Sequence, residues 1–164
     1  MNEGRGALTY VVGDATEPQG FGPKVIAHVC NDVGGWGKGF VTAISRRWRE
    51  PEQAYRAWYR AREINDFKLG SVQMIAVADG LWVANVIGQH GIGPASDGSP
   101  PVRYEAIEVG LQALAELART ESARVHMPRI GCGLAGGEWS ELEPIIGRTL
   151  LPAGIDTTVY DLAT

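Results

Sequence analysis

Residues 25–39 have the sequence VIAHVCNDVGGWGKG, in which a short apolar run passes directly into a glycine-rich loop. The run from Val25 to Cys30 is rich in β-branched residues, which is typical of a buried strand. Residues Phe40 to Trp48 then carry apolar side chains at helical spacing. The stretch therefore predicts a strand, a loop and a helix in succession, with the loop at a position where open α/β sheets bind ligands.

A second stretch repeats this arrangement closer to the C-terminus. Residues 127–137 have the sequence MPRIGCGLAGG, and they lie between a predicted strand at Val125 to Met127 and a predicted helix at Trp139 to Leu150. Glycine lets backbone N–H groups approach an anion without a Cβ in the way, and a helix N-terminus offers further unpaired N–H groups. We therefore expect the two loops to hold one diphosphate between them. The alternative is that the glycines only form tight turns.

The remaining pattern predicts a layered α/β architecture. Asp79-Gly80 favours a tight antiparallel hairpin, and residues 88–101 hold four glycines and three prolines, which is typical of a long surface loop. The other predicted strands are Leu8–Val12, Ser71–Val77, Leu81–Ile87 and Thr157–Leu162, and the other predicted helices are Pro51–Ile64 and Val102–Arg119. The expected fold class is a three-layer α/β/α arrangement in a single domain over residues 1–164, with a mixed, mostly parallel sheet of about six strands.

The composition narrows the function classes. The chain has 164 residues, of which 45% are hydrophobic, and a formal net charge of -4 with a pI near 5.4. General nucleic-acid binding is not expected, because it depends on clustered Lys and Arg. A membrane span needs about 18 consecutive apolar residues, and no apolar run in the sequence is that long. The N-terminus also lacks a signal-peptide pattern. Cys30 and Cys132 have no partners at zinc-ligand spacing, so we expect a cytoplasmic protein without a metal site or a disulfide.

Two better-known phosphate motifs are matched only in part. A Walker motif fails because Gly39 rather than Ser or Thr follows Lys38, and Asp32 stands in the place of its first glycine. The glycines of residues 131–136 match the G-x-G-x-x-G pattern of NAD-binding domains, but the chain ends without the further strands that such a domain requires. Neither a nucleoside triphosphatase nor an NAD enzyme is therefore expected.

Taken together, the motifs resemble those of a macro domain. The resemblance is carried by GDAT at 13–16, AHVCN at 27–31, the glycine loop at 34–39 and MPRIGCGL at 127–134. It is closest to the branch that contains the terminal ADP-ribose protein glycohydrolase and the DNA-ADP-ribose-reversing antitoxins, and it covers essentially the whole chain. It implies ADP-ribose, free or attached to a macromolecule, as ligand or substrate, with no separate cofactor and a place in nucleotide metabolism.

The resemblance also implies roles for individual residues. Asp14 is implied to accept a hydrogen bond from the adenine amino group, with the backbone N–H of Ala15 nearby and Tyr160 against the ring. Asn31 is implied to meet the distal ribose. The residues implied to surround the distal ribose and the diphosphate are Gly34, Gly35, Trp36, Gly37, Lys38, Gly39 and Phe40 in the first loop, Ile130, Gly131, Cys132, Gly133, Leu134, Ala135 and Gly136 in the second, and Gln89. A core role for Tyr160, a solvated Lys38 and a packing role for Cys132 are the alternatives.

The resemblance fails at two positions that matter for catalysis. The glycohydrolases of this branch use a lysine at the end of the hairpin strand as nucleophile, and Gln89 belongs to the segment that stands there. They also use an aspartate just after the glycine-cysteine-glycine-leucine run, where this chain has Ala135. Because glutamine cannot form a covalent adduct of this kind and alanine cannot relay a proton, the covalent lysine mechanism is not supported.

Three function classes remain. The preferred one is a noncovalent hydrolase of an ADP-ribose linkage or of ADP-ribose 1''-phosphate, with water activated by Asp32 or His90. For these two residues the alternatives are a turn aspartate and a solvent-facing histidine. The second class is a reader that binds ADP-ribose without turnover. The third is an interaction scaffold with an unused cleft, for which Trp36 and Trp82 supply exposed contacts.

Overall fold

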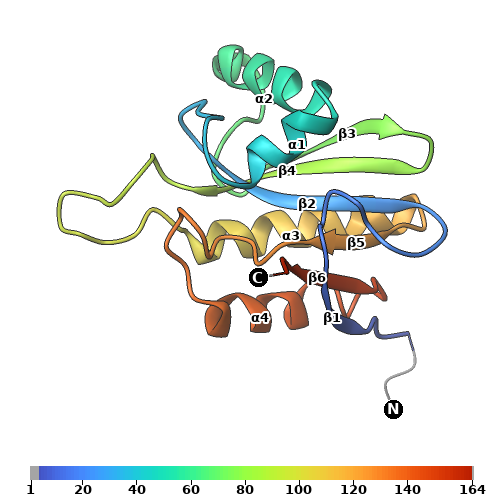
Figure 1. Ribbon diagram of the computed structural model, residues 1–164. Coiled ribbons are helices and arrows are strands. Elements are labelled where there is room, and N and C mark those ends of the chain that lie inside the picture. The colour runs from blue at the N-terminus through green and yellow to red at the C-terminus, as the bar shows by residue number, and fades with distance from the viewer. Residues whose placement is uncertain (1–3, 164) are drawn as a thin grey trace.

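The computed structural model describes residues 4–163, which form a six-stranded sheet with helices on both faces (Figure 1). The strands are β1 (Leu8–Val12), β2 (Lys24–Asn31), β3 (Val72–Ala78), β4 (Leu81–Gln89), β5 (Arg124–Met127) and β6 (Thr157–Asp161). Their order is β1-β6-β5-β2-β4-β3, and all neighbouring pairs are parallel except β3 and β4. The predicted sheet is confirmed, including its hairpin. The predicted domain spans residues 1–164, but residues 1–3 and Thr164 lie outside the described residues. The N-terminal segment, which is expected to lack a signal peptide, begins in the first of these ranges.

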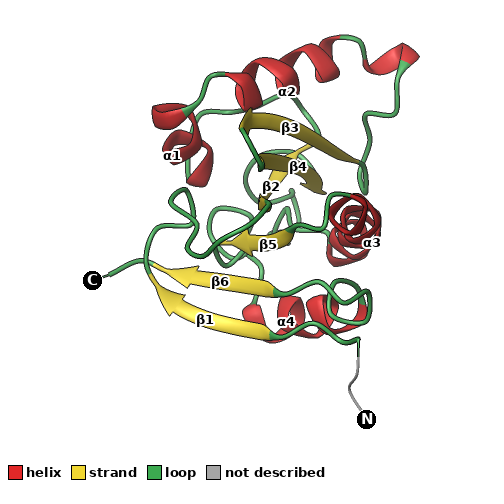
Figure 2. Cartoon of the chain, turned by 90° about the vertical axis from the view of Figure 1, so that its right-hand side faces the viewer, coloured by secondary structure: helices red, strands yellow, loops and turns green. Residues whose placement is uncertain are grey.

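The helices form two layers on opposite faces of this sheet (Figure 2). They are α1 (Phe40–Arg47), α2 (Glu50–Arg60), α3 (Tyr104–Thr120) and α4 (Trp139–Arg148), with a short 3-10 helix η1 (Arg62–Ile64). Alternate residues of β2 supply both cores, since successive side chains of a strand point to opposite faces. Val25 and Ala27 pack in the cluster beneath α3 and α4, whereas Ile26 and Cys30 pack beneath α1 and α2. The expected α/β/α layering is therefore confirmed.

Several element boundaries differ from the prediction by one or two residues, and the largest difference is at the end of α2. The helix expected over Pro51–Ile64 ends at Arg60 and gives way to η1. The side chain of Asn65 accounts for this end, because its Nδ2 donates to the carbonyl of Trp58 at 2.9 Å and its Oδ1 accepts from the amide of Phe67 at 2.8 Å. Strand β4 is longer than expected, since it continues to Gln89.

The parallel pairing of β2 with β5 brings the two glycine loops together. The carboxyl ends of parallel neighbours lie at the same edge of a sheet, so the loops that follow β2 and β5 lie side by side. Strand β4 is the other parallel neighbour of β2 and ends at the same edge, where Gln89 pairs with Asn31 after a register shift at Cys30. The segment that follows β4 projects from the body of the molecule as a long loop (Figure 1). Three loops from distant parts of the sequence therefore surround one place.

Candidate functional site

A cavity of about 710 Å³ lies at this edge of the sheet, which is a volume typical of sites for small ligands. Its wall includes both glycine loops, the start of α1 and the end of β4. The predicted ligand-binding residues that line it are Asn31, Gly35, Trp36, Gly37, Lys38, Gly39, Phe40, Gln89, Ile130, Gly131, Gly133, Leu134 and Ala135. Gly34, Cys132 and Gly136 belong to the same loops but are not part of the wall, and Asp14, Ala15 and Tyr160 lie elsewhere.

The side chain of Asn31 fixes the shape of the first glycine loop. Its Oδ1 accepts hydrogen bonds from the backbone N–H groups of Val33 and Gly35, both at 3.0 Å, and its Nδ2 donates to the carbonyl of Gly35 at 2.9 Å. The hydroxyl of Tyr55 accepts from the amide of Gly34 at 3.1 Å and lies 2.7 Å from the carbonyl oxygen of Asn31. Gly34 has a φ of 80°, a conformation that favours glycine. The loop is therefore held in place by the protein's own groups.

Both loops leave backbone N–H groups free to bind a ligand. The amides of residues 36–40 and 133–135 donate no hydrogen bond to any group within residues 4–163. The amides of Gly136 and Gly137, in contrast, close the second loop by donating to carbonyls inside it at 3.0 and 2.7 Å. No side chain caps the N-terminus of α1 or of α4 among the described residues. An anion held between the loops can take up these donors and gain from the positive ends of both helix dipoles.

Asp14 and Ala15, implied to bind the adenine, lie beside a second, smaller space. One carboxylate oxygen of Asp14 accepts from the amide and the hydroxyl of Thr16 at 2.8 and 2.7 Å, and the guanidinium of Arg47 lies 3.9 Å from the other. Partial burial opposes ionisation, but the bonds from Thr16 and the charge of Arg47 outweigh it and hold the pKa of Asp14 below its usual range. Asp14 lines a cavity of about 400 Å³ together with Arg46 and Arg47. Ala15 is buried.

Tyr160 is buried within the protein, with only 3% of the residue exposed. Its hydroxyl accepts a hydrogen bond from the amide of Gln19 at 2.8 Å and lies 2.8 Å from Nδ1 of His126. The hydroxyl therefore joins β5, β6 and the segment after β1. Contact of this ring with adenine stays a prediction.

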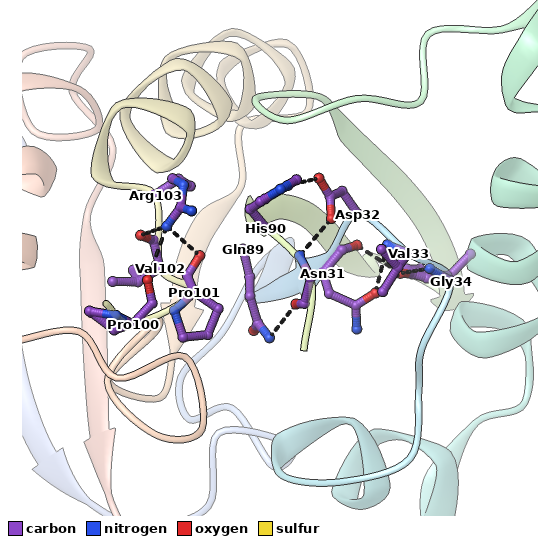
Figure 3. Close-up of polar contacts among 12 residues, drawn as sticks. Asn31, Asp32, Val33, Gly34, Gln89, His90, Pro100, Pro101, Val102 and Arg103 are labelled. Carbon is purple, nitrogen blue, oxygen red and sulfur yellow. Dashed lines mark hydrogen bonds and ion pairs between the residues drawn. The ribbon is translucent and has the colours of Figure 1, made fainter. Parts of the chain in front are cut away.

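Asp32 and His90, the candidate catalytic residues, form a pair although 58 positions separate them in the sequence (Figure 3). Nδ1 of His90 lies 2.7 Å from one carboxylate oxygen of Asp32, and the other oxygen accepts from the amide of Gly91 at 2.8 Å. The Asp32 side chain is 16% exposed and that of His90 is 61% exposed. Their neighbours Asn31 and Gln89 line the cavity, whereas the pair itself does not. The pair is therefore located at the rim of the site, with Nε2 of His90 available for chemistry.

The base of the long loop next to this pair is closed by hydrogen bonds. Nε2 of Gln89 donates to the carbonyl of Gly91 at 2.9 Å, and the amide of His90 donates to the carbonyl of Pro101 at 2.8 Å. The guanidinium of Arg103 donates to three successive carbonyls, from Pro100 to Val102, at 3.0 to 3.2 Å (Figure 3). These contacts fix the position at which His90 leaves the sheet. Gln89 therefore helps to fix the base of the long loop. It belongs to the segment where the resemblance to the glycohydrolases implies a lysine.

The expectation of an exposed Trp36 is wrong. Only 6% of this residue is exposed, and its Nε1 donates to the hydroxyl of Ser45 at 2.7 Å. Its ring packs edge-on against that of His28 with 5.4 Å between ring centroids. Because the indole is fully engaged within the α1 and α2 layer, it cannot serve as an exposed contact for a partner. Trp82 is half-buried and packs against the opposite core.

His28 and Ile92 are two of the cavity-wall residues that were not predicted. His28 is buried in β2 and lines the cavity, and Ile92 lines it from the long loop although 68% of Ile92 is exposed. A Cβ on Gly35 would lie 2.6 Å from the end of the Ile92 side chain, so this isoleucine rests on the first glycine loop. His28 lies two residues before Cys30 in the predicted strand and so on the same face of it. This spacing was the one feature of the sequence that could have placed His28 at the cavity. Nothing local in the sequence indicates the contact made by Ile92.

Metal binding and membrane insertion find no support in the part of the chain that the structure describes. Residues 4–163 contain no cluster of three His, Cys, Asp or Glu side chains able to hold a metal ion. Over the same residues, no helix combines the length and the apolar character needed to cross a membrane. Cys30 and Cys132 are both free thiols.

Comparison with solved structures decides the family. A macrodomain protein from Streptomyces coelicolor is 57% identical, with a TM-score of 0.84 over 94% of this chain and 98% of that one. The chain belongs to the macrodomain family. A protein of unknown function from Bacteroides thetaiotaomicron is 54% identical, with a TM-score of 0.93 over 96% of this chain and 99% of that one. A scan against protein-family models finds no match.

More distant relatives of this macrodomain carry functional names. The mouse chromodomain-helicase-DNA-binding protein 1-like is 32% identical over 94% of this chain, which spans only 18% of that relative's length. An ADP-ribose 1''-phosphate phosphatase from Meyerozyma guilliermondii is 24% identical over 86% of this chain and 93% of the relative. Thermosipho africanus DarTG, solved in complex with ADP-ribose, shares the fold with a TM-score of 0.75 at 20% identity, over 96% of this chain and 42% of that one.

Proposed function

We propose that this macrodomain binds ADP-ribose, with the diphosphate between the two glycine loops. The observation that carries the proposal is the set of free backbone N–H groups at residues 36–40 and 133–135, on two loops that line one cavity. A diphosphate offers only acceptors, which such donors satisfy. The names of two relatives, a phosphatase of ADP-ribose 1''-phosphate and a fold neighbour solved with ADP-ribose, support the same ligand.

Placing the diphosphate between the loops suggests positions for the other parts of the ligand. The distal ribose then lies near Asn31, which lines the cavity at the end of β2. We propose that the adenine lies toward the Asp14 side, where the carboxylate suits its exocyclic amine. We also propose a reducing, cytoplasmic location, in keeping with the two free thiols.

Calorimetric titration with ADP-ribose tests the binding, and Gly37 offers a matched pair of variants. Gly37 lines the cavity, its φ is not positive, and a Cβ there would meet no atom within 4 Å, so the position tolerates a side chain. Gly37→Asp adds a negative charge near the proposed diphosphate and is expected to weaken binding by a factor of about 10 or more. Gly37→Asn is nearly the same size without the charge and should cost much less. Absence of ADP-ribose binding by the unaltered protein overturns the proposal.

We further propose that the Asp32 and His90 pair hydrolyses the bond to the distal ribose or to its 1''-phosphate. Asp32 holds Nδ1 of His90 and so orients the imidazole, which leaves Nε2 to take a proton from water. The water oxygen forms a bond to the carbon or phosphorus under attack as the bond to the leaving group breaks. The proton taken up by His90 then passes to the leaving group, which returns the imidazole to its neutral form.

Turnover of ADP-ribosylated protein, ADP-ribosylated DNA and ADP-ribose 1''-phosphate tests this step. His90→Ala is expected to lower kcat by about 10²- to 10⁴-fold with little change in ADP-ribose affinity. Asp32→Asn keeps an acceptor for the amide of Gly91 but loses the carboxylate charge, so its loss should be smaller. Lys68→Ala is a control, because Lys68 is exposed and is not part of the cavity wall. Equal turnover by His90→Ala and the unaltered protein contradicts the assignment.

One observation favours a reader as the second candidate function. The cavity wall contains no Asp or Glu among the described residues, and the Asp32 and His90 pair stands outside the wall. Binding of ADP-ribose without turnover of any of the three substrates identifies a reader. In that case the contact of Asp32 with His90 and Gly91 serves only to fix the long loop.

A further inference from the structure

A chain of buried polar groups runs from α2 to His28 on the cavity wall. The Nδ2 of Asn85, in β4, donates to the carbonyl of Pro51 at 3.2 Å and to Oε1 of Gln73 at 3.1 Å. The Nε2 of Gln73, in β3, donates to the carbonyl of Ala54 at 3.1 Å. The Oδ1 of Asn85 lies 2.5 Å from Nε2 of His28. Asn85 is 0% exposed and His28 is 2% exposed, so water does not compete for the contact between these two side chains, whereas Gln73 is half-buried.

This chain determines which nitrogen of His28 carries the proton. Backbone carbonyls can only accept, so the amide groups of Asn85 and Gln73 must present their N–H groups to α2. The oxygen of Asn85 is then left to accept from His28, whose Nε2 must bear the hydrogen. Burial lowers the pKa of His28 to about 4, so the ring is neutral near pH 7. A neutral ring with a proton on Nε2 has a bare lone pair on Nδ1.

No group within residues 4–163 is placed to use that lone pair well. Within these residues, the polar contact of Nδ1 is with the Sγ of Cys30 at 3.9 Å, and this sulfur is 3.8 Å from Nε2 as well. An atom almost equidistant from both nitrogens is not in line with the lone pair of Nδ1, and a thiol is a weak donor. His28 is flanked by the rings of Trp36 and Phe40, which also line the cavity. The cavity is therefore where a donor for Nδ1 can enter.

We propose that His28 is a ligand-recognition residue whose Nδ1 accepts a hydrogen bond from a hydroxyl of the distal ribose. The inference rests on the proposed binding of ADP-ribose and deepens it. Diphosphate oxygens are acceptors and are repelled by a bare lone pair, while the adenine amine is assigned to the separate Asp14 side. Among the parts of ADP-ribose, the ribose hydroxyls are then the donors left for this position. His28 thereby distinguishes ADP-ribose from ADP, which lacks the distal ribose.

Titration of ADP-ribose and of ADP into two His28 variants tests the proposal. The terminal amide of His28→Gln reaches the position of Nε2 and can still donate to Asn85, but it leaves no acceptor at the position of Nδ1. We expect this variant to lose about 5- to 15-fold in ADP-ribose affinity and to keep its ADP affinity. His28→Asn places an amide near the position of Nδ1 and should recover much of the loss. Thermal unfolding of both variants shows whether the fold is kept.

Each outcome has a separate meaning. If the His28 variants lose the same affinity for ADP as for ADP-ribose, or lose affinity for neither, the role of His28 is overturned. The proposal that the unaltered protein binds ADP-ribose is not affected by either result. Failure of the unaltered protein to bind ADP-ribose overturns the proposed function and this inference with it. Ring ¹⁵N NMR of the free protein supplies a measurement that needs no variant. Observation of the proton on Nδ1 rather than Nε2 overturns the proposal directly, even if both variants fail to fold.

Discussion

Two glycines of the second loop, Gly133 and Gly137, look alike in the sequence but have different surroundings in the structure. A Cβ on Gly137 would lie 2.4 Å from the carbonyl oxygen of Gly131, a backbone atom that cannot move aside cheaply, whereas a Cβ on Gly133 would meet nothing within 4 Å. Gly137→Ala is therefore expected to lower the free energy of unfolding by about 1–3 kcal/mol and to weaken ADP-ribose binding. Gly133→Ala should stay within about 0.5 kcal/mol. Urea unfolding checks both, and equal stability of the two variants is the contrary result.

Two buried histidines predict how stability depends on pH. Burial lowers the pKa of His28 and that of His126 to about 4, with Lys24 and Arg124 adding to the effect at His126. The unfolded chain, with histidine pKa values near 6.5, therefore binds more protons between about pH 6.5 and pH 4. The free energy of unfolding falls as pH drops through this window, by at most about 1.4 kcal/mol per pH unit for each histidine.

Urea unfolding at several values between pH 7 and pH 5 measures this slope. His126→Gln should reduce it by about half, because one of the two protonation sites is removed. The carboxylates titrate in the unaltered protein and in His126→Gln alike. The difference between the pH slopes of the two proteins therefore gives the contribution of His126. An unchanged slope means that His126 is not protonated on unfolding in this range.

At the residue scale, the sequence predicts the loops better than the contacts between them. The glycines of residues 34–39 and 131–136 were recognisable because their positions after strands give them a physical meaning. The contact between Asp32 and His90 was not predictable, because it depends on the register of β2 with β4. Likewise, the position of His28 beside Asn85 needs the same register, since nothing near His28 in the sequence indicates a partner.

At the scale of elements, α3 lies close to the sheet because Gly110 has no side chain. A Cβ there would lie 2.5 Å from Cγ1 of Val86 in β4. Gly110→Ala is therefore expected to destabilise the protein by about 1–3 kcal/mol despite the better helix propensity of alanine. Val86→Ala in the same chain should relieve the clash, so the two changes together cost less than the sum of the single changes.

Gly147 in α4 is the matched control for this prediction. A Cβ there would have only the end of the flexible Arg5 side chain nearby, at 3.7 Å. Gly147→Ala should raise the free energy of unfolding by about 0.5–1 kcal/mol, as expected for glycine in a helix. Opposite signs for the two glycine-to-alanine changes, measured by urea unfolding, support the close packing of α3 on β4, and equal signs argue against it.

Elements were predictable where their period was long and regular, and less so at their ends. The apolar spacing between Val102 and Arg119 indicated α3, and the dipeptide Asp79-Gly80 indicated the hairpin. The end of α2 was missed because it depends on the side chain of Asn65, which bonds back to Trp58. Strand order cannot be derived from periodicity, because periodicity carries no information about which strands are neighbours.

At the scale of the whole molecule, the sheet joins the two ends of the chain and both helical layers. Strands β1 and β6, from opposite ends of the sequence, pair in register from Leu8 with Thr157 to Val12 with Asp161. Strand β2 lies inside the sheet and contributes to the cores on both faces. Loss of either layer therefore exposes one apolar face of the sheet that also supports the other layer.

We therefore expect residues 1–164 to unfold as one cooperative unit. Trp36 and Trp58 are buried in the layer of α1 and α2, and Trp139 packs against the core on the opposite side, so tryptophan fluorescence reports on both layers. Its transition in urea should coincide with that of far-UV circular dichroism, which follows the backbone. Two separate transitions contradict a single domain and indicate that one helical layer is lost first. Because the cavity is built from loops at the edge of this sheet, bound ADP-ribose should shift both transitions together to higher urea concentration.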